Sequence, residues 1–211
     1  MEILLLIFVV LVQNLAVFLD NHAIFFLTSN RNSSKVALAY TKKFQIDFLS
    51  RGFLFFTPPL LGLFLTHNNL YFLLLSLFIS AFVTLLLTIL QSINFLQNMK
   101  IQFLFPMTQK NILLLTLGLV VYSIYLYVPF YLNILSYYFK NQSLWIVQLS
   151  PALTAISTVF VVFYMDPKVA KFIDSSKGKK NSSVLFELIA IRILGRFVIL
   201  LSSTYLFFKL V

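Results

Sequence analysis

The chain has 211 residues, 60% of them hydrophobic and 10% charged, and its mean hydropathy is +0.95. Because a soluble domain carries about 25% charged residues, this composition excludes a water-soluble globular fold and predicts an integral membrane protein. The absence of cysteine excludes disulfides, thiolate catalysis and cysteine-ligated metals, and two histidines are too few for a histidine-rich metal centre. We therefore expect neither a metal nor another cofactor.

The apolar stretches predict an all-α bundle of about six transmembrane helices, which form one domain over residues 1–211. A helix needs about 20 residues to cross a hydrocarbon core of about 30 Å. The apolar runs are continuous and lack the alternation of a barrel strand, which favours helices over strands. The predicted spans are 3–27, 36–65, 70–90, 112–138, 144–165 and 184–208.

Lysine and arginine in the connections predict the orientation of these spans. Most of them follow the first, third and fifth spans, whereas the opposite side holds only Lys140 and Lys209. The positive-inside rule places the basic connections in the cytoplasm and both termini outside. The same rule accounts for the net charge of +10, so we expect no nucleic-acid partner. The basic residues concerned are Arg31, Lys35, Lys100, Lys110, Lys168, Lys171, Lys177, Lys179 and Lys180.

Ionisable residues inside the second span stand out, because a charge at mid-membrane costs roughly 2.5–3.5 kcal/mol on insertion scales. Lys43, Asp47 and Arg51 follow one another at four-residue spacing and therefore lie near one helix face. Asp47 can pair with either basic neighbour. An alternative for Lys43 is a place at the cytoplasmic interface, where its ammonium group reaches water.

Further charges fall in the first and last spans. Asp20 lies in the first span, and Glu187, Arg192 and Arg196 lie in the last, where the two arginines share a face. The guanidinium fork suits phosphate oxygens, so a cationic excess inside the bundle would suit an anionic headgroup. The alternative is that these charges neutralise one another and hold the helices together, and the sequence leaves both possibilities open.

Helix-breaking residues mark two further places. The pair Pro58-Pro59, followed by Gly62, predicts a break or kink in the outer half of the second span. Freed carbonyls there would need partners or water, so a cavity is one interpretation and a simple kink at the helix end is the other. Asp166-Pro167 predicts the end of the fifth span at the cytoplasmic face.

Short motifs in the second, fifth and last spans, which together cover roughly half of the chain, carry a resemblance to a known family. They are Lys35-Val36-Ala37-Leu38-Ala39, Ser50-Arg51, Pro59-Leu60-Leu61-Gly62, Ala155-Ile156-Ser157-Thr158, Asp166-Pro167-Lys168-Val169 and Arg192-Ile193-Leu194-Gly195. In this order they resemble the Amj family of bacterial membrane proteins, the lipid II flippases that are alternates to MurJ. Arg196 departs from the family pattern, which has a small polar residue there.

The resemblance implies a transporter rather than an enzyme. Its substrate would be lipid II, an undecaprenyl-diphosphate-linked peptidoglycan precursor, moved from the inner to the outer leaflet of a bacterial cytoplasmic membrane. As a hypothesis, we expect basic residues to bind the diphosphate, acidic residues to balance charge or couple, and helix breakers to act as hinges. The basic residues are Arg51, Arg192, Arg196 and Lys43. The acidic residues are Asp20, Asp47, Glu187 and Asp166. The helix breakers are Pro58, Pro59, Gly62 and Gly195.

Other classes of function are also compatible with the residues. One is a non-enzymatic subunit of a membrane complex, whose buried charges join helices. Another is an intramembrane enzyme or transporter that acts on a different polyprenyl-phosphate lipid, although no carboxylate pair or histidine cluster suggests a metal site. A third is an ion-coupled transporter of a small solute.

Overall fold

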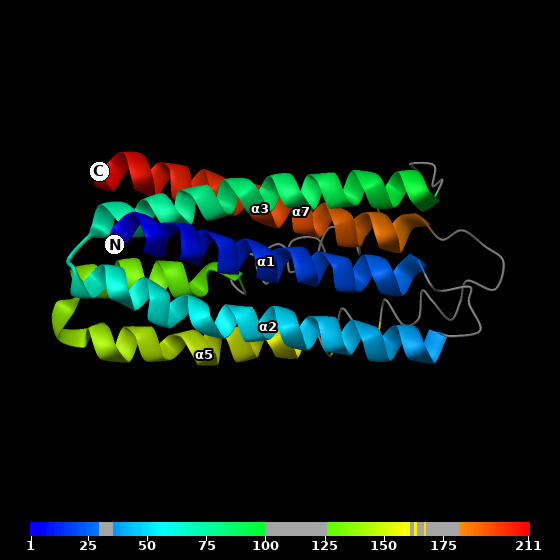
Figure 1. Cartoon of the computed structure of the whole chain (residues 1–211), viewed down its shortest axis with the longest axis horizontal. Coiled ribbons are helices and arrows are strands. Elements are labelled where there is room, and N and C mark those ends of the chain that lie inside the picture. Colours follow the sequence, from blue (N-terminus) through cyan, green and yellow to red (C-terminus); the bar gives the residue numbers. More distant parts are fainter. Residues whose placement is uncertain (30–35, 100–125, 161–162, 164–166, 168–181) are drawn as a thin grey trace.

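The computed structural model describes residues 1–29, 36–99, 126–160, 163, 167 and 182–211, and in this part of the chain it contains helices and short connections but no strand. The prediction of an all-α fold is confirmed. The helices run along the long axis of the molecule, and both chain ends lie at one end of the bundle (Figure 1). Their bounds are α1 Glu2–Ser29, α2 Val36–Thr66, α3 Leu70–Met99, helical residues 126–138, a 3₁₀ turn Lys140–Gln142, α5 Ser143–Phe160 and α7 Ser182–Leu210.

Four of these helices are long and apolar enough to cross a membrane, which makes the chain a multi-pass membrane protein. The four stretches are Glu2–Leu27, Leu38–Thr66, Leu70–Gln97 and Ile189–Leu210. They agree with the predicted first, second, third and last spans. The predicted fourth and fifth spans coincide in part with helical residues 126–138 and with α5, and apart from Phe163 the rest of each lies outside the described residues.

The end of α3 differs from the prediction, since the helix continues past residue 90 to Met99. The polar residues that end the apolar run turn inward and find partners there. Ser92 donates to the carbonyl of Thr88 at 2.6 Å, and Gln91 donates to the carbonyl of Phe18 on α1 at 3.2 Å. The polar residues after residue 90 therefore end the apolar run in the sequence, but they do not end helix α3.

Helix α2 also differs from the prediction, because it is not broken at Pro58 and Pro59. Each proline removes one backbone hydrogen bond, to the carbonyl four residues earlier. Helical geometry continues on both sides, and membrane helices tolerate such gaps where neighbours or polar groups lie close. Gly62 follows on the same helix, and apart from its chain neighbours and the adjacent helix backbone nothing lies within 4 Å of the place where a Cβ would stand.

The apolar core lies in the half of the bundle that also holds both chain ends. Helix α1 packs against α2 and α3, and α3 packs against α7. Large apolar side chains on the outer surface face what would be the lipid, as expected for a membrane bundle. The fully buried core side chains include Val9, Val17, Leu61, Phe64, Leu73, Leu77, Leu126, Phe130 and Ile199.

Charged residues of the spans gather in the other half, nearer to Ser29, Val36 and Ser182. At about 1.5 Å per residue, Asp20 lies about 14 Å from the Ser29 end of α1, and Arg192 lies about 15 Å from the Ser182 end of α7. The predicted cytoplasmic connections begin at these same ends. The fold thus separates an apolar half from a charged half along the direction in which a membrane would be crossed.

Candidate functional site: two arginine environments

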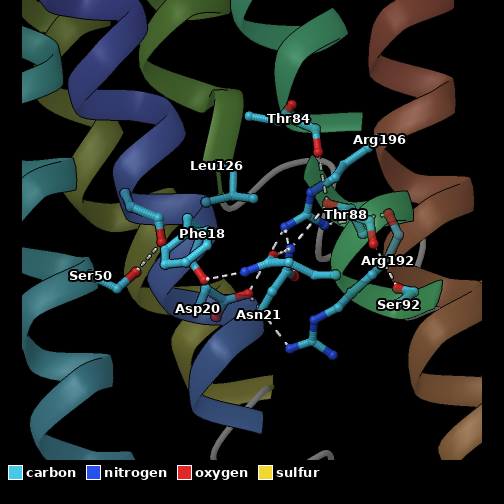
Figure 2. A network of polar contacts seen from close by, with 12 residues as sticks. Phe18, Asp20, Asn21, Ser50, Thr84, Thr88, Ser92, Leu126, Arg192 and Arg196 are labelled. Carbon is cyan, nitrogen blue, oxygen red and sulfur yellow. Dashed lines mark hydrogen bonds and ion pairs between the residues drawn. The ribbon is translucent and has the colours of Figure 1, made fainter. Parts of the chain in front are cut away.

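Two buried arginines of α7 share one carboxylate of α1. Only 1% of Arg192 and 1% of Arg196 is exposed. Asp20 Oδ2 lies 3.5 Å from Nη2 of Arg192 and 4.0 Å from Nη2 of Arg196. The four-residue spacing of the arginines puts both on the face of α7 that points to α1, as Figure 2 shows. A charged contact therefore joins the first and last helices inside the bundle.

Asn21 extends this contact to α3. Its side-chain nitrogen donates to Thr88 Oγ1 at 3.1 Å and to Gln91 Oε1 at 2.9 Å. Its side-chain oxygen accepts a bond of 3.4 Å from Nη2 of Arg196, whose Nη1 donates to the carbonyl of Arg192 at 3.3 Å. We call Asp20, Asn21, Arg192 and Arg196 the Asp20 cluster. It ties together three of the four candidate membrane spans (Figure 2).

A row of small hydroxyl side chains on α3 meets the cluster at Thr88. All five are buried, and they recur at every fourth residue, so they form one stripe along the helix. Thr84 meets the hydroxyl of Tyr127, and Thr88 donates to the carbonyl of Thr84 at 2.8 Å. This stripe was missed in the prediction, although its four-residue spacing is visible in the sequence. Its members are Ser76, Ser80, Thr84, Thr88 and Ser92.

On α2, the first two charges of the predicted stripe pair with each other. Lys43 Nζ lies 2.7 Å from Asp47 Oδ2, one turn further along the helix. Both side chains are largely buried, with 4% of Lys43 and 16% of Asp47 exposed. Of the two partners that the sequence allowed for Asp47, the structure pairs it with Lys43.

Arg51 lies in a different environment. It is half-buried and lines a cavity of about 470 Å³ between α2, helical residues 126–138 and α5. Within the described residues, no carboxylate lies within ion-pair distance of its guanidinium group and no side chain or carbonyl accepts a hydrogen bond from it. We call this space the Arg51 cavity. Its other walls include Leu54, Phe55, Pro58, Pro129, Pro151 and Val159.

The predicted site residues therefore separate into groups. Arg192, Arg196 and Asp20 come together, whereas neither arginine is among the described residues that line the Arg51 cavity. Pro58 lines that cavity, and Gly195 is buried on α7 just before Arg196. Pro59 lies on the exposed side of α2. The side chain of Glu187, on α7, and all of Asp166 lie outside the described residues.

These two environments offer different chemistry. Arg51 presents guanidinium donors that have no acceptor in the described part of the chain, beside an apolar wall, which suits an amphipathic anion. The Asp20 cluster presents two guanidinium groups that already hold a carboxylate. Within the described residues, no group of three histidine, aspartate or glutamate side chains could hold a metal ion.

Comparison with known proteins adds no relative. No protein-family model matches the chain, and neither the curated proteins nor the solved structures contain a match. The resemblance to the Amj family is carried by the short motifs of the second, fifth and last spans.

Proposed function

We propose that this chain is a lipid II flippase of a bacterial cytoplasmic membrane, with six spans and both termini outside. The observation that carries the proposal is the Asp20 cluster. Two arginines are buried inside a membrane-spanning bundle and share a single described carboxylate at 3.5 and 4.0 Å. Ionisable groups at this depth are costly, and in membrane proteins they mark substrate or ion pathways.

The chemistry of the cluster suits a diphosphate. A guanidinium group binds phosphate oxygens through two parallel hydrogen bonds, which gives both charge and geometry. Two such groups one helical turn apart can hold the two phosphates of one diphosphate. In the empty protein, Asp20 takes the place of that anion, so the interior of the bundle is never left with two bare positive charges. The arriving headgroup then displaces the carboxylate.

Movement of the headgroup needs the helices around the cluster to separate and close again. Gly195 lies between the two arginines on α7, and Gly62 has open space around it on α2. These are the proposed flexing points. The membrane potential contributes about 2.3 kcal/mol per charge for each 100 mV. Because the potential is negative inside, it favours outward movement of an anionic headgroup.

The complete burial of both guanidinium groups also fits a second function, that of a static brace in a subunit of a membrane complex. A brace needs the contact between α1 and α7 but not the charges, because a buried ion pair can often be replaced without loss of stability. A flippase needs the charges themselves. Substitutions that keep the packing and remove the charges separate the two functions.

The test is complementation of cells depleted of their resident lipid II flippase, with outer-leaflet lipid II as the readout. The double variant Asp20→Asn/Arg192→Gln removes one charge of each sign, so the net charge of the cluster is unchanged. We expect it to insert normally and to lose rescue. Lys209→Gln is the matched control, because it removes an exposed charge from the same helix. Rescue by the double variant would contradict the proposed site and favour the brace, and no rescue by a well-inserted wild-type protein would contradict the function.

A further inference from the structure

Three helices each contribute one proline to the lining of the Arg51 cavity. Pro58 comes from α2, Pro129 from helical residues 126–138, and Pro151 from α5. The remaining surface is mostly apolar, with Leu54, Phe55 and Val159 among the lining side chains. Arg51 is the charged side chain among the described residues of this lining. The cavity is thus an apolar space with one cationic end.

The cavity opens sideways, toward the place that the bilayer would occupy. Phe55 is 78% exposed and Val159 is 55% exposed, and both line it. These are large apolar side chains on helices α2 and α5, so their free surface would face lipid rather than water. A hydrocarbon chain can therefore enter from the membrane without crossing an aqueous space.

Helix α2 has one backbone carbonyl near the cavity without its helical partner. Pro58 has no N–H, so the carbonyl of Leu54 lacks its helical hydrogen bond from that residue. Leu54 itself lines the cavity, one turn from Arg51. The guanidinium donors of Arg51 match a headgroup that carries phosphate oxygens.

We propose that the Arg51 cavity is a lateral binding site for a prenyl diphosphate lipid, with the diphosphate on Arg51 and the first part of the prenyl chain along the three prolines. The identity of the lipid rests on the proposed function. The volume of about 470 Å³ falls among pockets that hold one small ligand, about 300–1,000 Å³, so it takes a section of one chain rather than two acyl chains side by side.

The direction of the cavity fits a lipid of the inner leaflet. Pro58 lies about 10 Å further along α2 than Arg51, in the direction away from Val36. The predicted orientation puts Val36 at the cytoplasmic side. The cationic end then faces the cytoplasm and the apolar end faces the membrane centre, as the headgroup and tail of an inner-leaflet lipid do. The site would collect the substrate before the Asp20 cluster receives its headgroup.

The test is binding to the purified full-length chain, measured by native mass spectrometry with farnesyl diphosphate and farnesol as probes. Arg51→Gln should weaken farnesyl diphosphate roughly 10- to 100-fold and leave farnesol unchanged, because it removes only the charge-assisted bonds. Ala155→Trp should weaken both probes, because it fills the apolar part of the cavity. The matched controls are Lys42→Gln on α2 and Ala152→Trp on α5, both at exposed positions outside the described lining.

Binding of farnesyl diphosphate to Arg51→Gln within about twofold of wild type would overturn the proposal. An equal loss in Lys42→Gln would also overturn it, since the effect would then be one of overall charge. Displacement of farnesyl diphosphate by phosphatidylglycerol at equal concentration would show an ordinary phospholipid site instead. Binding without rescue of flippase-depleted cells would refute the proposed flippase function and support the binding site in the Arg51 cavity. Rescue without binding would support the flippase function and refute this binding site.

Discussion

The two arginine environments use the same side chain at similar depth with opposite surroundings. In the Asp20 cluster, both guanidinium groups are buried and lie 3.5 and 4.0 Å from one carboxylate. In the Arg51 cavity, the guanidinium group is half-buried and has no ion pair within the described residues. The neighbours of an intramembrane charge, more than its presence, decide whether a ligand must first displace a carboxylate or meets the guanidinium group directly.

The comparison predicts opposite effects on stability when each environment loses a charge. The largest effect should follow Asp20→Ala, which leaves two buried guanidinium groups without their shared carboxylate. Breaking a buried pair in this way costs about 3–5 kcal/mol of the free energy of unfolding. Reversible unfolding in mixed micelles would measure the loss. Glu2→Ala, near the chain end, is the control; it removes one bond of 2.8 Å from Asn69 and should change the same free energy by only about 1 kcal/mol. A small effect at Asp20 would show that the arginines do not depend on it.

Removing the charge of the Arg51 cavity should stabilise the protein. Arg51→Leu takes a charge without a described ion pair out of a membrane span, so the free energy of unfolding should rise by about 1–3 kcal/mol. The same variant should fail to rescue flippase-depleted cells. Unfolding in mixed micelles and the complementation assay would give the two values. A clear loss of stability would mean that Arg51 supports the fold, and the contrast with the Asp20 cluster would disappear.

The smallest of these effects should come from the neutral member of the cluster. Asn21→Ala removes the bonds to Thr88 and Gln91 and the one from Arg196. Interhelical hydrogen bonds in membranes average about 0.6 kcal/mol, so the three together should contribute about 1–2 kcal/mol. Asn94→Ala, at an exposed position of α3, is the matched control for the unfolding measurement. Equal losses in both variants would show that Asn21 does not connect the helices.

Helix spacing predicted part of this arrangement. The four-residue separation of Arg192 and Arg196 put both on one face of the last helix, and the structure directs that face to Asp20. The same spacing placed Lys43, Asp47 and Arg51 on one face but gave Asp47 two possible partners. Choosing between them depends on rotamers and on neighbouring helices, which a sequence pattern does not contain.

Contacts between helices far apart in the sequence were beyond prediction for a similar reason. Asn21 has no local signal that directs it to Thr88 and Gln91, because these residues meet only when α1 packs on α3. The Arg51 cavity likewise forms only where α2, helical residues 126–138 and α5 come together. Composition and apolar run length fixed the helices themselves, since the bilayer constrains length and polarity far more tightly than it constrains packing.

Two of the prolines around the Arg51 cavity bear on how easily its width can change. Pro58 and Pro151 each lie inside a helix and each remove one backbone hydrogen bond from it, and both line the cavity. Bending a helix is easiest where such a bond is missing, so α2 and α5 bend most easily beside the cavity. Small bends of these two helices would then add up at one opening, while the rest of each helix stays straight. The lateral mouth could in this way admit a branched chain and close behind it without any helix unwinding.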